Sequence, residues 1–273
     1  MDNIRTPQVA GLFYPADPDQ LQNDVVKLLD STKSEKEYNN IFGLVAPHAG
    51  YVYSGKTAAH VYNLLRGKSY KRVVVISPSH TEYFPGSSVF NGDGYQTPIG
   101  ILEIDEEFAT KLVENSKNIF RGAEGHRSEH ALEVQLPFLQ TVLKDFKIVP
   151  VVMGDQGKIF VDELAEKLAE VADDETLIVA SSDMSHFYSK MDANKLDSVV
   201  EERINNFDFN SLQSDLEKKK TEACGGGPIV TMMKAASLRN KNHSTVIHRS
   251  DSGDTTGDTK EVVGYLSAVV YGD

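Results

Sequence analysis

Short, uncharged apolar runs recur along this chain, and three of them end a few residues before a histidine. Runs of this length that are rich in β-branched residues are typical of strands buried on both faces of a parallel sheet. The runs span residues 44–46, 73–76 and 177–180, and the histidines are His48, His80 and His186. Because ligands bind outside the carboxyl ends of parallel strands, the pattern predicts that these histidines meet at one sheet edge. Each histidine taken alone is equally compatible with a loop or core position.

Apolar residues at helical spacing separate the predicted strands. The first helix is predicted to begin at Pro18, with Asp17 as its N-cap. Further helices are predicted at 57–67, 105–116, 129–143, 158–172 and 228–238, with two more inside 192–220. Strands are predicted at 42–47, 71–77, 87–91, 147–154, 176–183, 244–250 and 261–272. The segments 95–100 and 250–258 are predicted to be loops.

This alternation of strands and helices indicates the fold class. It favours a single α/β domain over residues 1–273, with a mainly parallel sheet between two layers of helices. The two C-terminal strands are expected to add antiparallel pairing at one edge. The chain contains no internal repeat and no linker-like segment.

Composition excludes several function classes. The net charge is −12 and no lysine- or arginine-rich stripe occurs, which argues against nucleic-acid binding. No apolar stretch approaches the roughly 20 residues of a membrane span, and the N-terminus lacks the apolar core of a signal peptide. The single cysteine cannot form an internal disulfide. Together these features predict a cytoplasmic protein without a membrane or nucleic-acid partner.

The single cysteine is a further candidate for chemistry. Cys224 stands before three glycines and a predicted helix start, where the helix dipole favours the thiolate. With His48 and His80 it would supply two imidazoles and a thiolate, a three-ligand set typical of catalytic metal sites with an open position. Such a set suits zinc, and also Fe(II) or copper. The alternative is a buried structural cysteine.

Three other residues remain open between chemical and structural roles. His130 and Glu133 are three apart on a predicted helix and would share a face that can bind metal. They are equally compatible with acidic and capping residues of that helix, or with contacts to substrate or to metal ligands. Asp183 follows a predicted strand and is either an N-cap, a metal ligand or a group that orients an imidazole.

Eight sequence blocks together resemble those of the MEMO family, whose microbial members are called AmmeMemoRadiSam system protein B. In chain order they are VAGLFYPADP, APHAGYVYSG, SPSH, TPIG, EHALEVQLPFLQ, SSDMSHF, ACGGGP and SGDTTGD. The resemblance covers nearly the whole chain. It implies association with an AMMECR-type protein and a radical SAM protein.

The family is in turn similar in fold to class III extradiol dioxygenases, which bind Fe(II) through two histidines and a glutamate. The resemblance implies that His48 and His80 are metal ligands, that Cys224 takes the place of the glutamate, and that His186 is the acid–base residue. In such an enzyme, Asp183 and Glu133 would support these groups or contact substrate. A thiolate is softer than a carboxylate, which argues against ring cleavage but keeps the metal pocket.

Three functions are therefore expected in order of preference. The first is a mononuclear oxidoreductase-like enzyme with Fe(II), or alternatively copper, and an unknown substrate. The second is a non-enzymatic module that binds a peptide or partner, or handles metal, through the same pocket. The third is a zinc-dependent hydrolase, for which two histidines, a cysteine and water are chemically adequate.

Overall fold

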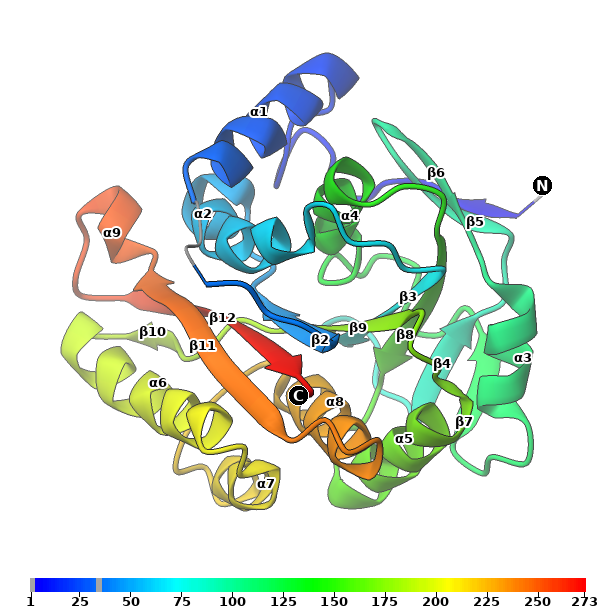
Figure 1. Cartoon of the computed structure of the whole chain (residues 1–273). Helices are drawn as coiled ribbons and strands as arrows, with labels where there is room; N and C mark the ends of the chain where they lie inside the picture. Colours follow the sequence, from blue (N-terminus) through cyan, green and yellow to red (C-terminus); the bar gives the residue numbers. More distant parts are fainter. Residues whose placement is uncertain (1–2, 33–35) are drawn as a thin grey trace.

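A large twisted sheet runs through the centre of the molecule, as the computed structural model shows for residues 3–32 and 36–273 (Figure 1). Four of its strands form a parallel core in the order β2, β9, β3, β8. Their bounds are β2 Ile41–Ala46, β9 Thr176–Ser181, β3 Arg72–Pro78 and β8 Lys147–Met153. The carboxyl ends of these four strands therefore lie along one edge of the sheet.

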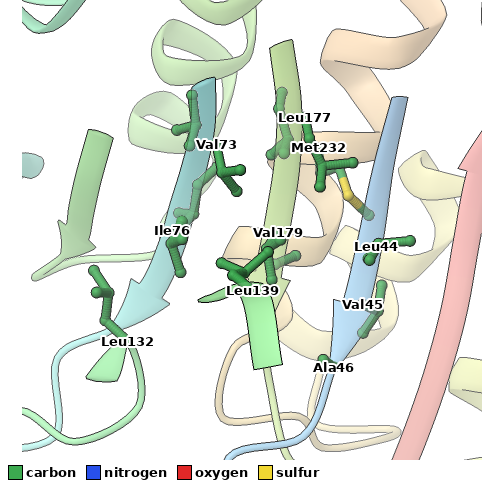
Figure 2. Packing of buried hydrophobic residues seen from close by; sticks show 14 of the residues in the cluster. Leu44, Val45, Ala46, Val73, Ile76, Leu132, Leu139, Leu177, Val179 and Met232 are labelled. Atoms are coloured by element: carbon green, nitrogen blue, oxygen red, sulfur yellow. The ribbon is translucent and has the colours of Figure 1, made fainter. Parts of the chain in front are cut away.

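The core strands are parallel and buried because their sequences are apolar on both faces. Every residue of β2, β3 and β9 is buried. Figure 2 shows Leu44 on β2, Val179 on β9 and Val73 on β3, whereas Met232 comes from the helix on the opposite face and packs against Gly43 of β2. Continuous burial of this kind requires helices on both faces of the sheet.

Helices cover both faces of this sheet (Figure 1). On one face lie α1 Pro18–Asp30, α2 Tyr51–Tyr62, the short 3-10 helix η1 Asn63–Leu65, and α4 Leu136–Val142. On the other lie α5 Lys158–Val171, α6 Lys190–Asn205, α7 Phe209–Glu217 and α8 Gly226–Leu238. Helix α3 Glu106–Val113 packs beside α5. No helix in the described ranges is long and apolar enough to cross a membrane.

Both sides of the parallel core carry antiparallel strands, so the complete sheet is mixed. On the C-terminal side, β12 pairs antiparallel with β2, β11 and β10, which confirms the expected antiparallel edge. On the other side, β4 pairs antiparallel with β8, and β7 continues parallel to β4. The bounds are β10 His186–Tyr188, β11 His243–Asp251, β12 Val262–Tyr271, β4 Ser87–Phe90 and β7 Ile119–Gly122.

A second, small sheet corrects the prediction of a loop at 95–100. Strands β1 Ile4–Arg5, β5 Gly94–Thr97 and β6 Gly100–Glu103 form it in the order β1-β5-β6. Proline and glycine lie at the turn between β5 and β6, and the flanking residues do not alternate cleanly in polarity. The sequence pattern therefore indicates a loop rather than a hairpin. The small sheet attaches the N-terminal arm to the body of the molecule.

Several helix boundaries differ from the sequence prediction. The long helix predicted at 129–143 is shorter in the structure: it consists of the 3-10 helix η2 Glu133–Gln135 followed by α4. Residues 129–132 are not helical, because the Glu129 carboxylate accepts from the backbone N–H groups of His130 and Ala131. Helix α2 begins six residues before the predicted start at 57, with no side chain capping it at Gly50. Inside the predicted loop 250–258 lies a short helix, α9 Gly253–Thr256.

Candidate metal centre

Three side chains meet at the carboxyl edge of the parallel core. His48 follows β2, His80 follows β3, and Cys224 lies two residues before α8. One nitrogen or sulfur atom of each lies within 4.8 Å of the others. A second group with the same spacing consists of His80, Glu129 and His130. The two groups share His80, so they form one continuous cluster.

Hydrogen bonds fix the tautomer of His48. The Ser181 hydroxyl donates its only hydrogen to the carbonyl oxygen of Ala131 at 2.7 Å, so it must accept from Nδ1–H of His48 at 2.9 Å. Nε2 of His48 therefore carries a lone pair, and it lies 3.2 Å from Cys224 Sγ. Burial, with the nearby His80 and His130, holds the pKa of His48 well below its usual value, so the ring is neutral. A neutral imidazole with a fixed lone pair is the form that binds a metal.

Glu129 performs the corresponding task for His80. Its carboxylate accepts from the backbone N–H of His80 at 2.6 Å and from Nδ1–H of the ring at 2.9 Å, which leaves Nε2 as the nitrogen available to a ligand. Burial alone would lower the pKa of His80, but the hydrogen bond to Glu129 raises it. In the sequence, Glu129 is the first residue of the helix predicted at 129–143, and no local pattern connects it with His80, which lies 49 residues away in the chain.

Close backbone packing places Cys224. A Cβ atom at Gly225 would lie 2.1 Å from the carbonyl oxygen of Ser181, so only glycine allows this approach. The backbone N–H of Asp183 donates to Cys224 Sγ at 3.2 Å, and the Cys224 N–H donates to the Asp183 carbonyl at 3.2 Å. Burial, reinforced by the charge of Asp183, raises the pKa of the thiol well above its usual value. This corrects the expectation that the helix start favours a thiolate: a nearby cation is needed to deprotonate it.

Asp183 lies within the cluster as a hydrogen-bond acceptor rather than as a helix cap. Its Oδ1 accepts from the backbone N–H of His48 at 2.8 Å, and its Oδ2 lies 3.9 Å from His48 Nε2. Burial raises the pKa of Asp183 to about 7, although hydrogen bonds from the backbone of His48 and Ala49 oppose the shift. A carboxyl group with this pKa can hold or release a proton near neutral pH.

The predicted pair of His130 and Glu133 is separated in the structure. The His130 ring stacks on His80 with centroids 4.9 Å apart and lies edge-on to His48 at 5.5 Å. The Glu133 carboxylate is fully buried and binds the N-terminal arm instead. Its partners are Arg5 Nη1 at 2.7 Å, the Tyr14 hydroxyl at 2.5 Å, and the backbone N–H groups of Gln8 and Val9. The two side chains diverge because residues 129–132 are not helical.

His186 stands between two cavities that flank the cluster. One, of about 580 Å³, is also lined by Cys224, Gln156 and Glu222. The other, of about 530 Å³, is also lined by His130 and Asp183. Burial lowers the pKa of His186, which favours the neutral ring. Among the described residues, His186 is outside both groups whose donor atoms are close enough to share an ion.

The donor set fits a transition metal. Two imidazole nitrogens and one sulfur converge, the outer nitrogens of both rings are hydrogen-bonded, and cavities leave room for a further ligand. Imidazole and thiolate are ligands of iron, copper and zinc rather than of magnesium or calcium. His48, His80 and Cys224 are the residues able to hold such an ion.

Comparison with known proteins gives one family. A sequence model of the family described as Memo-like protein matches residues 5–269. A MEMO1 family protein of Thermoplasma volcanium is 38% identical over 270 residues, covering 97% of this chain and 98% of that protein. One from Methanobrevibacter smithii is 37% identical over 279 residues, covering 97% and 99%. The crystal structure of an uncharacterized Escherichia coli K12 protein shares the fold, with a TM-score of 0.55 at 13% identity over 84% of this chain and 99% of that one.

Proposed function

The chain belongs to the Memo-like protein family, and from this premise we propose that it is a mononuclear iron- or copper-dependent oxidoreductase-like enzyme. The observation that carries the proposal is the convergence of His48, His80 and Cys224 within 4.8 Å beside a cavity. A closed structural site would have four protein ligands, whereas this set has three and an open side.

The protein's own groups account for binding and proton transfer. Ser181 and Glu129 orient the two rings so that both Nε2 atoms face the position of the ion. A bound iron or copper ion would supply one-electron chemistry and would stabilise the Cys224 thiolate. The His186 ring lines the cavity and is available to take or give a proton, and the Asp183 carboxyl, whose pKa burial raises to about 7, can hold one.

Metal analysis of protein purified without oxygen tests the proposal. We expect about one iron or copper ion per chain in the wild type, and a large loss in Cys224→Ser, because a hydroxyl is a far poorer ligand at neutral pH. His48→Gln should lose metal as well. His243→Gln is the matched control, because His243 is exposed and pairs only with Asp273 at the C-terminus; it should keep the wild-type content.

The other outcomes separate the alternatives. Zinc as the only tightly bound metal, without oxygen consumption, would favour the hydrolase. Protein that holds no metal and cannot be reloaded would leave the pocket as a peptide- or partner-binding module. Metal content unchanged in Cys224→Ser would remove this cysteine from the site.

A further inference from the structure

The cavity beside His130 and His186 has a one-sided charge. It has a volume of about 530 Å³, within the range of small-molecule sites. The carboxylates of Asp183, Asp258 and Glu261 line it, and no lysine or arginine does. Lys260 lies between two of these acids in the sequence, but it is not a lining residue.

The two acids at the rim have no cationic partner within the described residues. Asp258 accepts a hydrogen bond from the backbone N–H of Lys260 at 2.8 Å, and within residues 3–32 and 36–273 neither its carboxylate nor that of Glu261 forms an ion pair. The nearby Asp254, by contrast, is neutralised by Lys190 at 2.5 Å. The rim therefore keeps two uncompensated negative charges that face a cavity.

Aromatic rings form much of the remaining wall. Phe13, Tyr53, Phe187 and Tyr265 line the cavity. Phe187 is 71% exposed and has a φ of 64°, a backbone conformation that is strained for an aromatic residue. Aromatic faces attract organic cations, and carboxylates strengthen the attraction where water is partly excluded.

We propose that this cavity binds a small organic cation, a primary amine or guanidinium carried on a flat apolar body. The inference rests on the proposed function, because two lining residues, His130 and Asp183, contact His80 and His48, and it adds the charge of the substrate. The cationic group lies against Asp258 and Glu261, and the apolar body lies against the rings. The end of the body that carries no charge points toward His130 and His186.

Three probes with the same phenyl group and different charge test this proposal. They are 2-phenylethylamine, 2-phenylethanol and 3-phenylpropionate, titrated calorimetrically at neutral pH and low ionic strength. We expect the amine to bind at least about tenfold more tightly than the propionate, with the alcohol between them, and high salt to weaken the amine. The double variant Asp258→Asn/Glu261→Gln should weaken amine binding by about tenfold.

The matched control is Glu114→Gln/Asp145→Asn, which removes two exposed carboxylates that do not line the cavity and should leave amine affinity unchanged. Three results would overturn the proposal. They are propionate binding as tight as or tighter than amine binding, no binding of the amine, and unchanged amine affinity in the Asp258/Glu261 variant. Each titration is run on metal-loaded and chelator-stripped protein. Charge selectivity in stripped protein tests the cavity by itself, whereas metal content tests the proposed function.

Discussion

At the scale of single residues, hydrogen-bond partners that are not themselves candidate ligands orient the side chains of the cluster. Ser181 fixes the tautomer of His48 because its hydroxyl hydrogen is already given to Ala131. Glu129 orients His80 through both its ring and its backbone. Within residues 3–32 and 36–273, His186 forms no ion pair with a carboxylate; its ring hydrogen-bonds the backbone of Met184, and it lines both cavities. This difference in environment argues for two ligands and one proton carrier.

The role of His186 gives a prediction at this scale. His186→Ala should keep nearly the full metal content, because the proposed ligands are His48, His80 and Cys224. It should slow the consumption of dioxygen by iron-loaded protein with ascorbate by roughly 10²-fold or more, as expected when a general acid–base group is removed. Metal content and oxygen uptake are measured on the same sample. A variant that loses its metal would show instead that His186 is a ligand.

At the scale of elements, a buried carboxylate anchors the N-terminal arm to the body in addition to the small sheet. Glu133 accepts from Arg5 and Tyr14 and from two backbone N–H groups of the arm. Arg5 also donates to the carbonyl oxygens of His126 and Glu129, so the arm reaches the segment next to the cluster. The same arm carries Phe13, whose ring packs edge-on against His130 at 4.9 Å. Glu133 thus positions one wall of the cavity without touching it.

This attachment gives a second prediction. Glu133→Gln leaves the Arg5 guanidinium buried without its counter-charge, so the free energy of unfolding should fall by about 3–5 kcal/mol. Glu103→Gln breaks only the exposed pair with Lys147 and should cost about 1 kcal/mol or less. Both are measured by urea unfolding at neutral pH. Metal content should stay unchanged in Glu133→Gln; loss of metal from a folded variant would contradict a purely positioning role.

At the scale of the whole molecule, a buried histidine joins the two sheets. His126 accepts from the Tyr95 hydroxyl of β5 at 2.5 Å and donates from Nε2–H to the carbonyl of Ser88 in β4 at 3.0 Å. Burial lowers its pKa to about 3, so the folded protein keeps this ring neutral. The unfolded chain takes up a proton at the ordinary histidine pKa of about 6.5. Unfolding is therefore coupled to proton uptake between these two values.

The sign of this coupling gives a third prediction. Between about pH 6.5 and 3 the unfolded state binds one more proton at this site, so stability falls as the pH falls, by about 1.4 kcal/mol per unit. The loss of stability from pH 7 to pH 5 should be smaller in His126→Gln than in the wild type by about 2 kcal/mol. Urea unfolding at both pH values measures it. His243→Gln, which changes an exposed ring, should keep the wild-type pH dependence; an equal change in both variants would refute the coupling.

Much of the fold could be predicted from local patterns. The runs before His48, His80 and His186 are apolar on both faces, and such runs form buried strands wherever helices cover them. The parallel core, the C-terminal antiparallel edge and the two helices within 192–220 follow from these patterns. The prediction of a helix over 129–143 was wrong for its first four residues. The Glu129 carboxylate accepts hydrogen bonds from the backbone N–H groups of His80, His130 and Ala131, and helix propensity takes no account of such tertiary contacts.

The sequence by itself determined the four strands of the parallel core, the edge at which their carboxyl ends lie, and the candidates His48, His80 and Cys224, since strand burial and turn chemistry are local properties. The tertiary structure alone decided that these three meet, that Glu129 serves His80, and that Glu133 faces the arm. It also decided the protonation of Cys224, because burial next to Asp183 outweighs the helix start. These outcomes depend on distances between residues far apart in the chain, and no local pattern encodes such distances.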